Sequence, residues 1–133
     1  MGYRAVRIPL SCDLSRDLSC DLACDLATVR LWADHMRAHV DDVSASLRNE
    51  GVEHEIWFLY PGPPLCAIGV MKGDDAVAAA AVAARSTLSV DQVHRDFKAH
   101  WITSGIVGVA FAPDAPDPFP GCELLFEARP RQP

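Results

Sequence analysis

One histidine lies among the apolar residues of a predicted helix, and it is the residue best placed for chemistry. Residues 89–101 are predicted as that helix because apolar side chains recur along it at spacings of three and four. They are Val90, Val93, Phe97 and Trp101, and His94 shares their face. Burying a polar group without a partner costs about 1–3 kcal/mol, so the imidazole requires one. Its ordinary pKa lies near neutral pH, which suits a general acid or base.

A predicted strand at residues 52–60 offers the partner. Side chains alternate between the two faces of a strand, so Glu55 shares a face with Glu53, Trp57 and Leu59. His54 lies on the opposite face, with Ile56, Phe58 and Tyr60. Only one of Glu55 and His54 can therefore point into a given cavity. We favour Glu55 as the residue that orients His94 or shares its proton, and keep His54 as a second candidate acid or base.

Aromatic side chains near these groups predict the walls of a ligand pocket. Apolar walls with a few converging polar groups are typical of small-molecule sites. The candidates for substrate binding are Trp57, Phe58, Tyr60, Phe97 and Trp101. The first hypothesis is a cofactor-independent enzyme that uses acid–base chemistry on a hydrophobic metabolite, of the cyclase, isomerase or lyase type. It requires no cofactor and no metal.

Other interpretations of the same residues stay open. His94 can be a structural histidine, hydrogen-bonded to Glu55 or to a backbone carbonyl, and the tryptophans can belong to the core or to a dimer interface. A second hypothesis is a ligand-binding or accessory protein without catalysis. Haem binding through His94 or His54 is a third hypothesis, although no Cys-X-X-Cys-His motif is present.

The composition excludes several classes of protein. The chain has 133 residues and a formal net charge of −6, whereas a nucleic-acid partner calls for a basic stripe. No run approaches the roughly 18 apolar residues that span a bilayer. The five cysteines are an odd number, and no export signal accompanies them, so we expect no disulfide framework. These observations predict a cytoplasmic protein that binds neither nucleic acid nor membranes.

Two spacings resemble metal sites without completing one. His35 and His39 are four residues apart on a predicted helix, and no acidic third ligand follows them in a known pattern. Four tandem Xaa-Asp-Leu-Xaa tetrads start at Cys12, Arg16, Cys20 and Cys24. We interpret these tetrads, at residues 12–27, as an expanded connection, because lengthening a loop costs little entropy. An interaction arm or a metal surface is the alternative.

The elements predict one α+β domain over residues 1–133. Strands are expected at 3–10, 52–60, 65–71 and 123–128, and helices at 27–49, 76–85 and 89–101. Residues 105–112 are expected as a strand or a buried loop, and the proline-rich residues 113–121 as irregular. Gly51 is expected to end the long helix, and Ser89 and Gln92 fit a capping box. This order matches the ferredoxin-like βαββαβ fold with an antiparallel sheet.

The predicted sheet also suggests a partner. Helices cover one face of such a sheet, yet both faces of residues 52–60 carry large apolar side chains. The simplest cover for the second face is another copy of the chain around a two-fold axis. We therefore expect a homodimer of the dimeric α+β-barrel type.

Three segments resemble a small uncharacterised bacterial family of the dimeric α+β-barrel kind. They are residues 49–59, 89–97 and 123–127, and the likeness extends over about residues 3–10 and 27–128. Glu55 and Trp57 match the family's strand motif, and Asp91, His94 and Phe97 match its helix motif. Where the family carries a His-Pro pair, the corresponding stretch here is Thr87-Leu88-Ser89, which puts a two-histidine site in doubt. The wider group includes cofactor-free monooxygenases, polyketide cyclases, muconolactone-type isomerases and haem proteins, so the resemblance implies a fold, and function does not follow from it.

Overall fold

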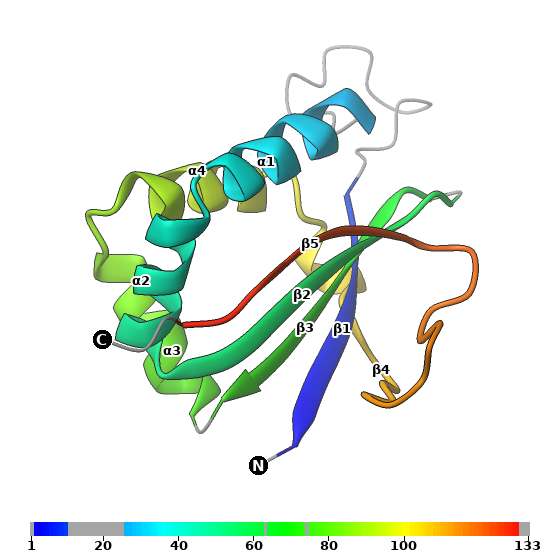
Figure 1. Ribbon diagram of the computed structural model, residues 1–133. Coiled ribbons are helices and arrows are strands. Elements are labelled where there is room, and N and C mark those ends of the chain that lie inside the picture. The colour runs from blue at the N-terminus through cyan, green and yellow to red at the C-terminus, as the bar shows by residue number, and fades with distance from the viewer. Residues whose placement is uncertain (1, 11–25, 63, 74, 131–133) are drawn as a thin grey trace.

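The computed structural model describes residues 2–10, 26–62, 64–73 and 75–130 (Figure 1). The predicted tetrad repeat at 12–27 lies outside these residues, apart from the two that begin the first helix. In chain order the elements are β1 (Tyr3–Pro9), α1 (Leu26–Ala38), α2 (Val40–Glu50), β2 (Val52–Tyr60), β3 (Cys66–Gly73), α3 (Ala76–Arg85), α4 (Ser89–Lys98), a 3-10 helix (Thr103–Gly105), β4 (Val107–Val109) and β5 (Glu123–Ala128).

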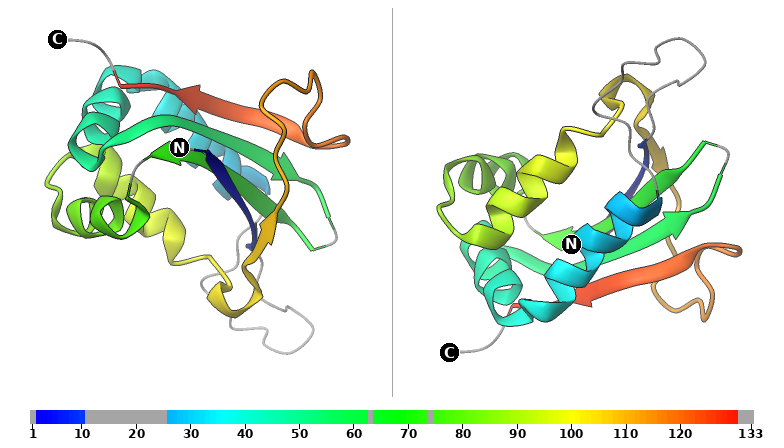
Figure 2. Two further views of the ribbon diagram at one scale, coloured as in Figure 1. Left: turned by 90° about the horizontal axis from the view of Figure 1, so that it is seen from below. Right: turned by 90° about the horizontal axis from the view of Figure 1, so that it is seen from above.

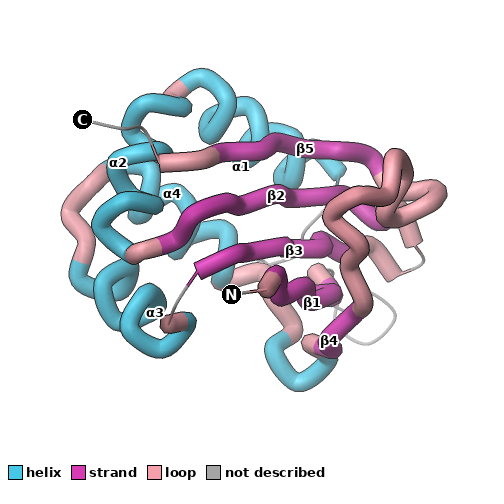
Figure 3. Tube along the Cα trace, turned by 60° about the horizontal axis from the view of Figure 1, so that its bottom comes forward, coloured by secondary structure: helices cyan, strands magenta, loops and turns pink. Residues whose placement is uncertain are grey.

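The strands form one open antiparallel sheet in the order β4-β1-β3-β2-β5. Helices α1 and α4 lie over one face of this sheet, and α2 and α3 lie at the end where β2 begins and β3 ends (Figures 1 and 2). The segment between β4 and β5 crosses the opposite face (Figure 3). The predicted α+β class and the antiparallel sheet are therefore confirmed. None of the helices in the described residues has the length and apolar character needed to cross a bilayer.

The long helix predicted over residues 27–49 is two helices. His39 has φ −120° and ψ 40°, which are not helical values, and it separates α1 from α2. A straight helix of that length would extend about 35 Å, farther than the nine-residue strand beneath it. The break lets α2 turn over the end of the sheet. Val40, predicted on the apolar stripe, is 41% exposed for this reason. Gly51 ends α2 as predicted, in the left-handed conformation with φ 72°.

The start of α4 differs from its prediction. The helix begins at Ser89, but the serine does not cap it, because Leu88 is the N-cap residue and its side chain accepts no hydrogen bond. The predicted capping box is therefore wrong. The Ser86 hydroxyl instead accepts the backbone N–H of Leu88 at 3.2 Å. The helix ends at Lys98, so Trp101 follows it rather than belonging to it.

A core of aromatic and aliphatic side chains fills the space between the helices and the sheet. Trp57 is 2% exposed and pairs across the strands with Gly69. A Cβ atom on Gly69 would come within 2.7 Å of the indole, so glycine makes room for the ring there. Trp32 from α1 stacks on Phe97 from α4 with ring centroids 4.1 Å apart. These contacts fix α1 and α4 on the sheet.

The second face of the sheet is covered by the chain itself. Its buried apolar residues are Ala5, Ile56, Phe58, Ile68 and Val70, and Phe111, Phe119 and Cys122 from the segment before β5 pack against them. Phe119 meets Phe58 edge to face at 5.0 Å between centroids. The apolar face from which we predicted a homodimer is thus buried within one chain.

Candidate functional site

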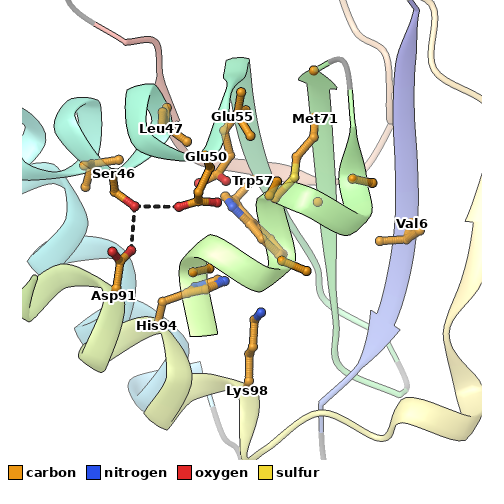
Figure 4. A pocket seen from close by; sticks show the side chains of 18 of the residues that line it. Val6, Ser46, Leu47, Glu50, Glu55, Trp57, Met71, Asp91, His94 and Lys98 are labelled. Atoms are coloured by element: carbon orange, nitrogen blue, oxygen red, sulfur yellow. Dashed lines mark hydrogen bonds between the residues drawn. The ribbon is translucent and has the colours of Figure 1, made fainter. Parts of the chain in front are cut away.

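A cavity of about 850 Å³ lies between the helices and the sheet face that carries Trp57 (Figure 4). Its size falls in the range of small-molecule sites. Helix α3 contributes a wall of small side chains, namely Ala76, Ala79, Ala80, Ala83 and Ala84. Polar side chains of α2, β2 and α4 converge at one end, where Figure 4 shows Ser46, Glu50, Glu55, Asp91, His94 and Lys98. The cavity therefore has an apolar body and one polar end.

Glu55 is buried on the cavity wall in β2. Its side chain forms no ion pair among the described residues, and the residue is 8% exposed. Burial raises the pKa of the Glu55 carboxyl to about 7, the neighbouring carboxyls of Glu50 and Asp91 add to the rise, and Trp57 and Lys98 oppose it. The indole N–H of Trp57 approaches this carboxyl but does not reach hydrogen-bond geometry. A carboxyl of this kind is present in both protonation states at neutral pH.

His94 lies in an aromatic cluster. Its ring centroid is 5.8 Å from that of Trp32, 5.7 Å from Trp57 and 5.9 Å from Trp101. Burial lowers the pKa of His94 to about 3, and the positive charges of Lys98 and Arg95 lower it further. The imidazole is therefore neutral at physiological pH. Figure 4 shows its nitrogen atoms facing the cavity.

The structure brings the predicted pair of Glu55 and His94 to one cavity without joining them. Neither residue makes a hydrogen bond to the other within the described part of the chain, and the Trp57 indole neighbours both. Glu55 therefore does not hold the imidazole in place. Ring contacts do so instead, and both polar groups remain available to a ligand.

Sequence reasoning missed a hydrogen-bonded network beside this pair. The Ser46 hydroxyl lies 2.6 Å from Glu50 Oε2 and 2.6 Å from Asp91 Oδ1, and the Ser86 hydroxyl donates to Asp91 Oδ2. Burial raises the pKa of Glu50, and the charge of Asp91 raises it further. The Ser46 hydroxyl and the charge of Lys98 act in the opposite direction and lower it. A signal was available in the spacings of three and four that join Asp91, His94 and Lys98 on α4.

The other predicted residues divide between the two faces. Trp101 lines the cavity, and Phe97 is buried against Trp32 without lining it. Phe58 and Tyr60 belong to the second face. There His54 is also fully bonded: its Nδ1 lies 2.8 Å from the Tyr3 hydroxyl and its Nε2 lies 2.5 Å from Glu127 Oε2. Neither His54 nor the aromatic residues of its face reach the cavity.

Three buried indole N–H groups surround His94 without a hydrogen-bond acceptor among the described residues. They belong to Trp32, Trp57 and Trp101. Buried donors are usually paired, so unpaired donors beside a cavity indicate positions that a ligand or water can complete. Trp57 and Trp101 both line the cavity, and Figure 4 shows the indole nitrogen of Trp57 at its polar end.

The spacing of His35 on α1 and His39 directly after it does not build a metal site. His35 and His39 stack with ring centroids 4.1 Å apart, and the His39 ring bonds the backbone oxygen of His35. Across the described ranges, no three His, Cys, Asp or Glu side chains are grouped so that they could hold a metal ion.

Comparison with known proteins identifies one family. The model of a family of unknown function (DUF6176) matches residues 25–114, which span the polar end of the cavity from α2 to α4. No match was found among curated proteins or solved structures.

Proposed function

Since the chain belongs to this family of unknown function, we propose its activity from the cavity: cofactor-independent proton transfer on a hydrophobic small molecule, of the isomerase, cyclase or lyase type. One observation carries the proposal. A buried carboxyl, Glu55, lies at the polar end of a cavity of about 850 Å³ whose remaining walls are mostly apolar. A carboxyl in such a place can exchange a proton with a bound carbon acid.

The two predicted catalytic residues then take different roles. Glu55 is the acid–base group, because its pKa of about 7 lets it accept and return a proton near neutral pH. His94 stays neutral and serves as a hydrogen-bond partner for a substrate oxygen or nitrogen. In an isomerisation, Glu55 takes a proton from one carbon, the electron pair shifts along the substrate, and the proton returns at another carbon. The sum of atoms and electrons is unchanged, so no oxidant or reductant is required.

Hydrogen exchange tests this proposal without knowledge of the natural substrate. The protein is incubated in D₂O with a panel of hydrophobic ketones, enones and lactones that fit the cavity, and loss of C–H signals is followed by proton NMR. We expect at least one compound to exchange. Glu55→Gln should reduce its rate by about 10²–10⁴-fold, because the amide cannot accept the proton.

The matched control is Glu53→Gln. Glu53 lies on the same strand but is exposed and is 3.8 Å from Lys72, outside the cavity. This variant should exchange like the unmodified protein. If compounds raise the melting temperature but none exchanges, the chain is a ligand-binding protein and the proposal of catalysis fails. Equal rates in both variants would also contradict it.

We also propose a ferredoxin-like origin for the fold, and the homodimer remains a prediction. The order β4-β1-β3-β2, with a helical segment between β1 and β2 and another between β3 and β4, supports a ferredoxin-like origin to which β5 adds an edge strand. The argument for a homodimer was an uncovered apolar face of the sheet. It is weaker now, because the segment that contains Phe111 and Phe119 covers that face. Light scattering would read twice the chain mass of 14.5 kDa for a dimer.

A further inference from the structure

A serine hydroxyl with two carboxyl neighbours lies at the polar end of the cavity. Ser46 Oγ is 2.6 Å from Glu50 Oε2 and 2.6 Å from Asp91 Oδ1 (Figure 4). A hydroxyl has one proton, so it can donate to only one of these oxygens at such a distance. If both carboxyls were ionised, the other contact would set two lone pairs against each other. The pair of Glu50 and Asp91 must therefore hold one additional proton.

The neighbouring bonds favour Glu50 as the carboxyl that holds this proton, because two hydroxyls can donate to an ionised Asp91. Ser86 accepts the N–H of Leu88, so its own proton is free to go to Asp91 Oδ2. Asp91 can thus receive a hydroxyl at each oxygen, from Ser86 and from Ser46. Ser46 then accepts a hydrogen bond from a protonated Glu50. Burial and the charge of Asp91 act in the same direction by raising the pKa of Glu50.

A separate observation connects this network with a ligand. Glu50 lines the cavity, and Figure 4 shows its carboxyl beside that of Glu55, with the indole nitrogen of Trp57 directed at both. Trp57 is 2% exposed, and its N–H has no acceptor of hydrogen-bond geometry among the described residues. A ligand atom that entered this corner would meet two carboxyls and an unpaired donor.

We propose that Glu50 is a second proton-carrying group of the cavity, held protonated by its burial beside Asp91, to which Ser46 joins it, and that it acts as the acid opposite Glu55. This inference rests on the proposed acid–base function. Glu55 as the base breaks a C–H bond and takes that proton, while Glu50 gives its own proton to a different substrate atom. The substrate then undergoes a net shift of a double bond or a ring closure, with no change in its number of protons. After the product leaves, Glu55 loses a proton to water and Glu50 takes one from water, which restores both groups. Two carboxyls whose surroundings separate their roles are typical of such pairs.

Titratable and charged groups surround Glu50 and influence its pKa. Glu55 faces it from β2, and Asp91, His94 and Lys98 face it from α4. The remaining charged groups on the cavity wall are Arg4, Asp75 and Arg95. Asp91 is the charge that the network joins directly to Glu50 through Ser46, so a change there should have the largest effect.

The test begins with the ligand-free protein, so it does not depend on finding a substrate. Carbon NMR of protein labelled at the glutamate carboxyls follows each side chain through pH, with the Glu50 signal assigned by its loss in Glu50→Gln. We expect Glu50 to stay protonated above the pH range in which a glutamate carboxyl ordinarily ionises. Asp91→Asn removes the neighbouring charge and leaves Ser46 free to donate to Glu50, so the Glu50 midpoint should fall by about one pH unit or more.

Asp96→Asn is the control, because Asp96 is exposed on the same helix and pairs with Gln92. It should leave the Glu50 midpoint unchanged, and near-ultraviolet circular dichroism verifies that each variant is folded. The proposal is overturned if Glu50 ionises in the ordinary pH range of a glutamate carboxyl, or if Asp91→Asn has no effect on its midpoint.

A separate measurement tests the proposed role of Glu50 as the acid. With a compound that exchanges in D₂O, Glu50→Gln should keep the exchange, which requires only Glu55, and lose conversion by about 100-fold. Equal loss of exchange and conversion would contradict an acid role for Glu50. If the titration behaves as expected and no compound exchanges, the proposed function fails while the proton on Glu50 stands.

Discussion

The two faces of the sheet place their histidines in opposite environments. On the second face, both ring nitrogens of His54 have partners, the Tyr3 hydroxyl at 2.8 Å and Glu127 at 2.5 Å, and aromatic side chains close over the strands. On the first face, His94 is surrounded by aromatic rings and its nitrogens face a cavity. Polar groups that are fully bonded stabilise a packed layer, whereas polar groups held in place by apolar contacts remain available to bind.

The same contrast separates the acidic residues. Glu127 is partly exposed, with its charge near Arg129 and His54, and Glu55 is buried without an ion pair among the described residues. An uncompensated buried carboxyl costs stability when it ionises. The first face therefore carries a cost in folding stability that the second face does not. Such a cost is typical of a functional site.

The largest expected effect concerns His94. Its pKa is about 3 when folded against an ordinary 6.5, so the unfolded chain binds the proton first as pH falls. Stability that is present above pH 6.5 should be lost between pH 6.5 and 3. The free energy of unfolding should fall by at most about 5 kcal/mol over this range. The full value is an upper limit, because part of the ring faces the cavity. In His94→Gln this loss should disappear. Urea unfolding across this pH range measures the difference between the two proteins.

The control for His94 is His39→Gln, at an exposed position. This variant should follow the unmodified protein through the whole pH range. An acid limb that is identical in all three proteins would mean that His94 titrates as an exposed histidine, and the contrast between the faces would lose its main support.

Glu55 should give the next largest effect, with the opposite sign. Its folded pKa of about 7 exceeds the ordinary 4.5, so the folded state holds the proton longer as pH rises. Stability present below pH 4.5 should fall by about 3 kcal/mol between pH 4.5 and 7. Glu55→Gln should remove this decline, whereas Glu53→Gln should retain it. Urea unfolding at several pH values measures it, and a decline that survives in Glu55→Gln would show that another group is responsible.

The smallest effect belongs to the second face. Tyr3→Phe removes the hydroxyl that bonds His54 Nδ1 and keeps the ring that contacts Phe111 at 5.1 Å between centroids. We expect a loss of about 1 kcal/mol in urea unfolding. Exchange in D₂O should not change, because the cavity lies on the other side of the sheet. A variant that loses exchange as completely as Glu55→Gln would show that the two faces are coupled.

Local patterns predicted several features of the fold correctly. Alternation along β2 separated Glu55 and Trp57 from His54 and Phe58, and the structure places them on opposite faces. Pleat geometry requires this alternation, and it holds here although the ladder shifts register between Val52 and His54. Helix α3 and strand β5 also have the predicted bounds, because flanking polar and turn residues end them.

Features that depend on distant packing were not predictable in this way. The apolar stripe through α1 and α2 is continuous in sequence, and only the limited length of the sheet beneath explains the break at His39. Similarly, the cover of the second face by Phe119 depends on how the segment before β5 returns across the strands. Likewise, the described residues show no hydrogen bond between Glu55 and His94, because ring packing decides where the imidazole lies.

The sequence by itself determined which side chains share a face, because the periods of strand and helix are local properties of the backbone. It thereby brought Glu55, Trp57 and His94 into one candidate site. Only the tertiary structure decided which of them touch, and it joined Ser46 and Glu50 of α2 to Asp91 of α4. Contacts between elements follow from the angle at which helices cross the sheet, and that angle is set by the packed core as a whole. Protonation states depend on burial and neighbouring charges, so they too were decided at that level.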